Sequence, residues 1–266
     1  MKAWQKVGLV LAVLVFCAAA VVWVLPARWA LSWLAPQLHG LQLQQVQGTL
    51  WNGRAAHVLA PTGRDLGAAQ WQLSRRALLG QVDLHLLLDG PQLNFSGTLR
   101  NLPADQVEWR DVTLRLDLAL LPTAVPAAIG QPGGELTMQL DHALLQSGWP
   151  LQLSARGQWR SASLHTRRAE FVLGTMQWQA AAQNGAIQAQ LRDDGHGPLE
   201  VAMSAQLSPL GWRLDARLHA QQTASMALRQ WLASLGPVDS SGTVTLHRDG
   251  GLARLLPAAP SPLAWK

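Results

Sequence analysis

The chain of 266 residues has no tyrosine, three phenylalanines and a single cysteine. That cysteine, Cys17, lies inside an apolar run near the N-terminus, so everything that follows lacks a thiol. Disulfide bonds and a cysteine nucleophile are therefore excluded from the bulk of the chain, which must hold together by packing alone.

Motifs for catalysis and nucleotide binding are also missing. There is no G-x-S-x-G stretch, no P-loop and no dinucleotide fingerprint. The eight histidines stand singly, and none has a histidine or cysteine partner at metal-ligand spacing. The Asp193–Gly197 cluster offers two carboxylates but lacks the later ligands of a calcium loop, and we interpret it as a hairpin turn. We expect no catalytic, cofactor-binding or metal site, and no enzyme activity.

Charge is sparse and evenly spread. Only 14% of residues are charged, with 21 basic against 16 acidic residues. The arginines form just two adjacent pairs, Arg75-Arg76 and Arg167-Arg168. No basic stripe with interleaved aromatic residues occurs, so nucleic acid is not an expected partner.

A long apolar run, Val7 to Leu25, begins the chain and contains no charged residue. A helix of this length crosses a bilayer core of about 30 Å. Lys2 and Lys6 precede the run, so the positive-inside rule leaves residues 1–6 as a cytoplasmic tail and places the bulk of the chain on the far side. The sequence therefore predicts a single transmembrane helix over residues 7–25. Its positions include Val7, Leu11, Leu14, Cys17, Val21 and Leu25.

A cleaved secretory signal peptide is the alternative interpretation of the same run. Ala18-Ala19-Ala20 offers small residues to a peptidase, but the run continues to Leu25 and exceeds the roughly 7–15 residues of a signal core. The uncleaved anchor is favoured. Residues 26–39 follow as a predicted juxtamembrane helix with Trp29 and Trp33 on one face. This helix either lies in the outer leaflet of the membrane or continues the anchor and packs on the first strand.

From Gly40 onward, apolar and polar residues alternate with the period of a half-buried strand. Val82 to Leu88 and Val112 to Leu120 show this clearly. Turn residues separate the runs at roughly ten-residue spacing, which favours antiparallel pairing. The sequence predicts a mainly β protein: an N-terminal transmembrane helix, then an elongated, curved antiparallel sheet over residues 40–254. Residues 255–266 form a flexible tail.

Two short helices interrupt the predicted strands. The first runs from Pro122 to Gly130, where a glycine ends it. The second runs from Thr223 to Leu235, with Thr223 or Ser225 as its cap, and Gly236-Pro237 ends it. Each helix is followed by a glycine turn and a further strand, so the two breaks occupy similar places in the chain.

The two halves of the β region resemble each other. Four matches recur in the same order at nearly constant offset, which predicts a tandem duplication with halves of about 40–147 and 148–254. The matched residues are Trp51 with Trp159, Gly67–Gln72 with Gly174–Gln179, Gly90-Pro91 with Gly197-Pro198, and Trp109-Arg110 with Trp212-Arg213.

Three stretches make the chain similar to protein N of the bacterial type II secretion system. They are Pro26–Trp29 after the apolar run, Gly48-Thr49-Leu50-Trp51-Asn52-Gly53, and Leu235-Gly236 followed by Gly242-Thr243-Val244. The resemblance covers nearly the whole chain in order and length. The family motif residues are Gly48, Thr49, Trp51 and Gly53. Kinship with AsmA-like proteins, whose curved β-sheets are associated with lipid handling, is also implied.

The resemblance implies a bitopic protein of the bacterial inner membrane, with a cytoplasmic N-terminus and a periplasmic β domain. Its role would be that of a non-enzymatic accessory component of the apparatus that moves folded proteins across the outer membrane. The expected partners are bitopic inner-membrane assembly proteins and the outer-membrane secretin, contacted through strand edges or an apolar surface.

The alternative function is that of a lipid- or hydrophobe-binding, AsmA-like envelope protein with an apolar β groove. A sheet with one apolar face either closes on its own core or leaves such a groove open. The residues that would line the groove, or else form an ordinary core, are Leu84, Leu86, Phe95, Leu114 and Leu116.

Overall fold

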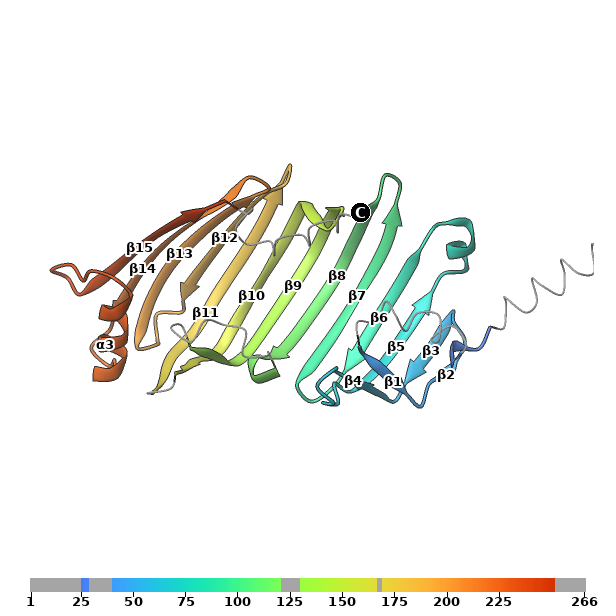
Figure 1. Cartoon of the computed structure of the whole chain (residues 1–266), viewed down its shortest axis with the longest axis horizontal. Helices are drawn as coiled ribbons and strands as arrows, with labels where there is room; N and C mark the ends of the chain where they lie inside the picture. The colour runs from blue at the N-terminus through green and yellow to red at the C-terminus, as the bar shows by residue number, and fades with distance from the viewer. Residues whose placement is uncertain (1–24, 29–39, 121–129, 167–168, 252–266) are drawn as a thin grey trace, which may run out of the picture. The chain divides into compact units, whose positions relative to one another are not determined.

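The computed structural model describes residues 25–28, 40–120, 130–166 and 169–251 (Figure 1). The chain forms two compact units, an N-terminal unit up to Arg100 and a C-terminal unit from Asn101 onward. Antiparallel strands make up most of both units. The prediction of a mainly β protein with antiparallel pairing is confirmed.

Several predicted segments lie outside the described residues. They are the tail 1–6, the anchor 7–25 except its last residue, most of the helix 26–39, most of the helix 122–130, and the tail 255–266. Within the part of the chain that is described, no helix is both long and apolar enough to cross a membrane. The anchor therefore stays a prediction.

The N-terminal unit contains a small sheet and a larger one. In the small sheet, β1 (Gln42–Gln44) pairs with β4 (His57–Leu59). The strands of the larger sheet follow the order β2 (Gln47–Gly48), β3 (Asn52–Ala55), β5 (Ala68–Leu73), β6 (Asp83–Asp89) and β7 (Leu93–Leu102). A small buried core of Ala55, Val58 and Ala69 joins the two sheets.

A 3₁₀ turn that the alternation pattern did not predict connects β5 to β6. This turn, η2 (Arg75–Leu79), begins after Ser74, whose hydroxyl accepts the Arg76 N–H at 3.3 Å. It ends at Gly80, which takes the left-handed conformation (φ 80°) that glycine favours. A capping serine and a closing glycine are the local signals that identify it in the sequence.

The C-terminal unit is an up-and-down meander in which each strand pairs with the next along the chain. A short 3₁₀ turn, η3 (Leu118–Leu120), follows its first strand. Its strands are β8 (Gln106–Asp117), β9 (Gln131–Gln146), β10 (Trp149–His165), β11 (Glu170–Gln183), β12 (Ala186–Asp193), β13 (Leu199–Ser208), β14 (Gly211–Ala220) and β15 (Thr243–Gly250).

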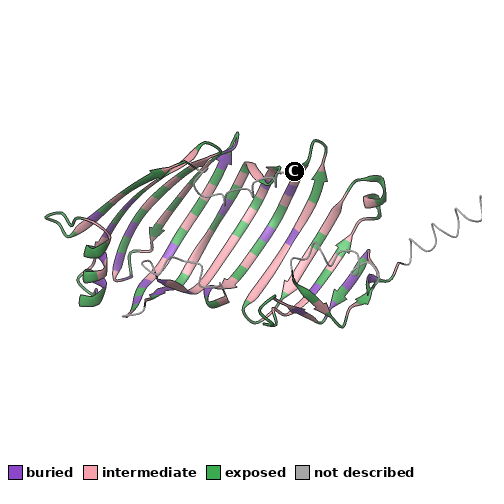
Figure 2. Cartoon of the chain, in the orientation of Figure 1, coloured by how far each residue is buried: buried purple, intermediate pink, exposed green. Residues whose placement is uncertain are grey.

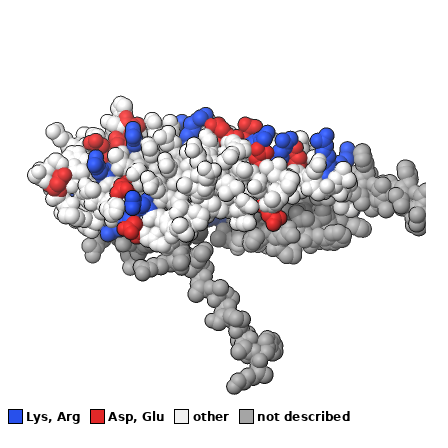
Figure 3. Space-filling view, turned by 90° about the horizontal axis from the view of Figure 1, so that it is seen from above, with Lys and Arg blue, Asp and Glu red and all other residues white. Residues whose placement is uncertain are grey.

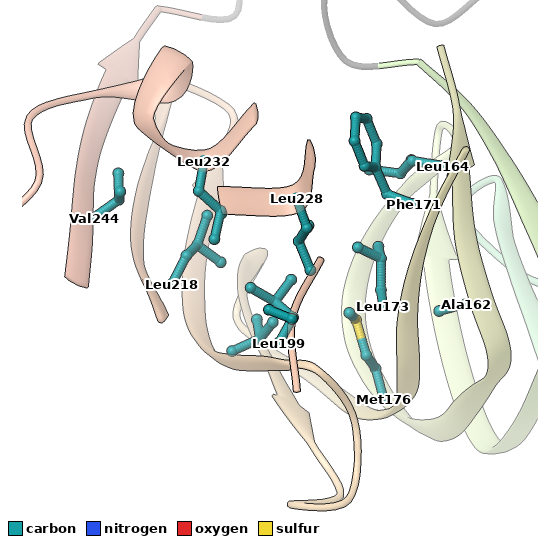
Figure 4. Close-up of a cluster of buried hydrophobic side chains, with 12 residues drawn as sticks. Ala162, Leu164, Phe171, Leu173, Met176, Leu199, Leu218, Leu228, Leu232 and Val244 are labelled. Carbon is teal, nitrogen blue, oxygen red and sulfur yellow. The ribbon is translucent and has the colours of Figure 1, made fainter. Parts of the chain in front are cut away.

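The helix α3 (Met226–Leu235) covers the β14–β15 end of this meander (Figure 1). The predicted second helix is confirmed, with Ser225 as the cap: its hydroxyl accepts the Leu228 N–H at 3.2 Å. Leu228 and Leu232 are only 1% and 3% exposed. Figure 4 shows both side chains pointing into a cluster with side chains of the sheet, so α3 is the lid on the main hydrophobic core.

Burial is uneven along the meander. On β12, exposed residues alternate with half-buried ones and none is fully buried, whereas β10, β11 and β13 each contain two or more buried residues (Figure 2). The half-buried residues of β12 are Ile187, Ala189, Leu191 and Asp193. The mostly apolar face of β12 is therefore only partly covered.

Candidate functional site

The Gly48–Gly53 motif forms the tight turn between β2 and β3. The Thr49 N–H donates to the Asn52 carbonyl at 2.9 Å, and the Asn52 N–H donates to Thr49 Oγ1 at 3.1 Å. Gly48 has a φ of 87°, and a Cβ at this position would crowd the Asn52 carbonyl oxygen. Backbone conformation and space both require glycine here.

Two tryptophans hold this turn in place. Trp51 is 6% exposed, and Trp71 donates its Nε1–H to the Leu50 carbonyl at 3.1 Å. Gly53 faces Trp71 across the strands, and any Cβ at Gly53 would overlap the indole ring. The motif thus shapes a turn and carries no reactive group.

The same turn binds the chain where it leaves the predicted anchor. The Leu50 N–H donates to the Leu25 carbonyl at 3.0 Å, and Pro26 forms an antiparallel bridge with Thr49. Ala27 is 1% exposed. Because backbone bonds fix residues 25–26 against the turn, the motif determines how the chain enters the N-terminal unit.

Several histidines that look isolated in the sequence are paired with carboxylates in the structure. His57 Nδ1 lies 2.6 Å from Asp65 Oδ2, and His247 Nδ1 lies 2.6 Å from Asp215 Oδ1. The carboxylate partners come from neighbouring strands or turns, so the spacing of residues in the sequence did not predict these pairs. Such exposed pairs contribute little stability. Among the described residues, no group of three or more metal-ligating side chains occurs.

The Asp193–Gly197 cluster forms the turn between β12 and β13, as predicted. Asp193 accepts the N–H groups of Gly195 and Val201 at 2.9 and 2.7 Å. Asp194 accepts the His196 N–H at 3.0 Å. Both carboxylates are thus engaged in ordering the turn backbone.

A buried carboxylate on β8 was not singled out by the sequence. Glu108 is 5% exposed, and its Oε1 accepts bonds from Arg110 Nη2 at 2.6 Å and His142 Nε2 at 3.0 Å. The Arg110 guanidinium lowers the pKa of Glu108 below its ordinary value; burial acts in the opposite direction, and His142 adds to the lowering. The register of β8 with β9, which places Arg110 opposite His142, creates this cluster.

We expect Glu108→Gln to destabilise the protein by about 1–3 kcal/mol at pH 7, since hydrogen bonds to a charged group are lost. The folded pKa is lowered, so the ionised carboxylate stabilises the fold above the ordinary glutamate pKa, and this stabilisation is lost as the pH falls through the folded value. The difference from wild type should therefore shrink below about pH 4. Urea unfolding at several pH values measures it. Glu200→Gln, at an exposed position on β13, is the control, and a difference independent of pH would contradict the assignment.

A polar groove of about 610 Å³ lies over β9 to β12. Arg156 in it pairs with Asp141 at 3.3 Å, and the Gln179 amide donates to Gln190 Oε1 at 3.1 Å. Of the residues that line the groove, none is acidic. Guanidinium and amide groups supply many donors, which suits a polar or acidic chain segment rather than catalysis. The polar lining includes Thr137, Gln139, Arg156, Gln158, Arg160, Gln177, Gln179, Gln190 and Arg192.

Outside this groove, acidic and basic side chains are mixed on the face shown in Figure 3. Cross-strand ion pairs also occur, such as Arg100 with Asp83 at 3.1 Å and Arg115 with Glu135 at 2.7 Å. Surface pairs of this kind are solvated and screened by salt. The charge pattern is that of ordinary strand surfaces.

The outer edge of β15 offers backbone hydrogen-bonding groups. The Asp239 N–H donates to the Thr243 carbonyl at 3.0 Å, and the Asp239 carboxylate accepts the Thr243 N–H at 2.9 Å. Thr243 therefore points its backbone away from β14, and alternation turns the same groups of His247 and Asp249 outward, whereas the Thr245 N–H faces Pro237 in the bridge between Val238 and Val244. Beyond the bridge between Val238 and Val244, no segment in the described ranges pairs with this edge.

The five residues proposed for an apolar groove are all half-buried. Three of them, Leu84, Leu86 and Phe95, belong to the N-terminal unit, where β6 pairs with β7. The other two, Leu114 and Leu116, lie on β8 of the C-terminal unit opposite Met138 and Leu136 of β9. Their partial exposure is that of a sheet face with incomplete cover.

Comparison with known proteins points to one family. The family model described as type II secretion system (T2SS), protein N, matches residues 39–247. A relative named type II secretion system protein N from Aeromonas hydrophila is 24% identical over 236 residues, covering 85% of this chain and 90% of the relative. A relative of the same name from Vibrio cholerae is 27% identical over 252 residues, covering 86% and 91%. A third, from Pectobacterium carotovorum, is 24% identical over 229 residues, covering 85% and 90%. No solved structure matches the chain significantly.

Proposed function

The chain belongs to the type II secretion system protein N family, and we propose that it is a non-enzymatic accessory component of that apparatus, working through protein–protein contacts. The apolar run Val7–Leu25 anchors it in the inner membrane and the β region lies in the periplasm. Its partners are other envelope proteins of the apparatus, namely the bitopic inner-membrane assembly proteins and the outer-membrane secretin.

The observation that carries the proposal is the outer edge of β15. A strand edge with outward N–H and C=O groups is a template on which a partner strand can add. His247 and Asp249 supply these groups. The polar groove over β9 to β12 is a second surface rich in donors. The lining of the groove contains no histidine and no carboxylate that could act as a general base, which favours recognition over catalysis there.

In-cell photo-crosslinking tests the proposal. A photoreactive residue at Arg248, which is exposed on β15, should yield adducts with proteins of the secretion apparatus. Asp249→Pro removes one outward donor while leaving the bonds to β14 in place, and it should reduce these adducts and secretion several-fold. Asp249→Ala also removes the carboxylate but keeps the N–H, and it is the matched control. Equal adducts and equal secretion in the two variants would rule out strand addition at this edge.

A second candidate function is lipid or hydrophobe binding in the manner of AsmA-like proteins. The half-buried apolar face of β12 and the partial exposure of Leu84, Leu86 and Leu114 favour it. The folded chain would then co-purify with lipid, and photoreactive residues on that face would give lipid adducts. Lipid adducts without any protein adduct at β15 would replace the first proposal with this one.

We also propose that the β region arose by tandem duplication, with halves of about 40–147 and 148–254. Two matched glycine contacts support it. A Cβ at Gly90 would lie 3.1 Å from the Gly67 Cα, and a Cβ at Gly197 would lie 3.0 Å from the Gly174 Cα. Gly67 and Gly174 have similar left-handed φ angles of 110° and 103°. The four glycines are those matched by sequence, so each half contains the same close backbone approach.

A further inference from the structure

The η2 tip, defined as residues 74–80, exposes two adjacent leucines. Leu78 and Leu79 are 60% and 82% exposed, and η2 buries none of its residues. The tip is nevertheless ordered, because Ser74 caps its start and Gly80 closes it. Turns of soluble proteins usually carry polar residues at such places. An ordered turn that presents two leucines indicates an apolar partner.

Basic residues stand beside these leucines. Arg75 and Arg76 open the turn, both are exposed, and η2 contains no acidic residue. Guanidinium groups bind phosphates through charge-assisted hydrogen bonds. Leucines next to arginines on one short element are the combination that binds at the interface of an anionic bilayer.

The tip lies at the end of the N-terminal unit where the chain enters from the predicted anchor. The Leu50 N–H donates to the Leu25 carbonyl at 3.0 Å, and the next residue, Trp51, accepts the Leu73 N–H at 2.8 Å. Ser74 then begins the tip. Leu50 and Trp51 therefore lie next to Leu25 and Leu73, respectively. Each of these two neighbours is at about the 4.8 Å spacing of adjacent strands.

We propose that the η2 tip is a second membrane contact, in which Leu78 and Leu79 enter the periplasmic interface of an anionic bilayer and Arg76 binds lipid phosphate. The inference rests on the proposed anchor at Val7–Leu25, which brings this end of the unit to the bilayer. Two contacts restrict the tilt of the N-terminal unit relative to the membrane, whereas one flexible tether would not.

An environment-sensitive fluorophore reports the contact. The full chain carries Cys17→Ala and Leu78→Cys, is labelled with nitrobenzoxadiazole, and is reconstituted in vesicles of phosphatidylethanolamine and phosphatidylglycerol. We expect a blue-shifted emission that spin-labelled lipid quenches. Leu79→Ser should lower the inserted fraction about tenfold, and Arg76→Gln about fivefold. A label at Thr62, in the turn before β5 and therefore at the opposite end of that strand, is the control and should show neither effect.

Carbonate extraction of the same vesicles separates this inference from the proposed anchor. Chains that resist extraction but show no lipid-dependent shift overturn the membrane tip and leave the anchor standing. Chains that carbonate extracts overturn the anchor. Vesicles of the same composition are then added to the extracted chains. A blue shift of the label at position 78 supports the membrane tip, and no shift overturns it. A shift that requires another protein instead of lipid also overturns the inference.

Discussion

Replacing Leu228 with alanine is expected to destabilise the C-terminal unit by about 3 kcal/mol, within the range of about 2–5 kcal/mol found for leucine deletions in packed cores. Leu228 is 1% exposed and lies in the cluster that joins α3 to the sheet. The cavity cannot easily collapse, because Phe171 and Trp231 stack beside it with ring centroids 5.5 Å apart. Urea unfolding of the full chain, followed by tryptophan fluorescence, measures the loss.

The matched control for this variant is Met226→Ala on the same helix. Met226 is 68% exposed, and alanine is the better helix former, so the free energy of unfolding should change by less than about 0.5 kcal/mol. Equal losses in the two variants would show that α3 does not cover the core. If only Leu228→Ala loses stability, Val244 of β15 should also become more exposed in that variant, because Val244 belongs to the same cluster as Leu228.

Replacing Gly67 with alanine is expected to destabilise the N-terminal unit by at least about 3 kcal/mol. One part of the cost is the left-handed backbone (φ 110°), which disfavours any residue with a Cβ by about 1–2 kcal/mol. The other part is overpacking, because the new Cβ would overlap the Asp89 carbonyl and the Gly90 backbone. Hydrogen–deuterium exchange of peptides from residues 42–89, in a urea series, measures the local opening.

Gly63→Ala separates the two costs. Gly63 also has a positive φ, 79°, but a Cβ there meets no atom within 4 Å. Its loss should be only about 1 kcal/mol, from the backbone conformation alone. If Gly63→Ala and Gly67→Ala open the unit equally, close approach of the backbone at Gly67 and Gly90 is not what requires glycine.

Local signals in the sequence predicted local structure well. The alternation of Val82–Leu88 gave β6, and Ser225 with Gly236-Pro237 gave α3 to within three residues at its start. A capping serine and a closing glycine also mark η2. This turn was not predicted, because the sequence around it was interpreted only by the alternation expected of strands. The family resemblance came from three short stretches in order along the chain, of which the Gly48–Gly53 motif forms a turn that requires its glycines.

Pairings between distant residues could not be predicted in this way. The burial of Glu108 depends on the register that brings His142 across from Arg110. The carboxylate partner of His247 is Asp215, which is opposite it only because β14 and β15 pair in one particular register. A shift of one residue in either pairing would place the two partners on opposite faces of the sheet. Alternation alone gives the face of each residue but not its neighbour.

The sequence by itself determined the fold class, the absence of a thiol after Cys17, the helix α3 and the family. Each of these depends on residue type and on neighbours within a few positions. The tertiary structure alone decided which edge groups of β15 point outward, how far α3 covers the sheet, and that the η2 tip lies at the end of its unit where Leu25 enters. These features depend on strand order and register, which are set by the sum of many long-range contacts and leave no mark in any single stretch of the chain.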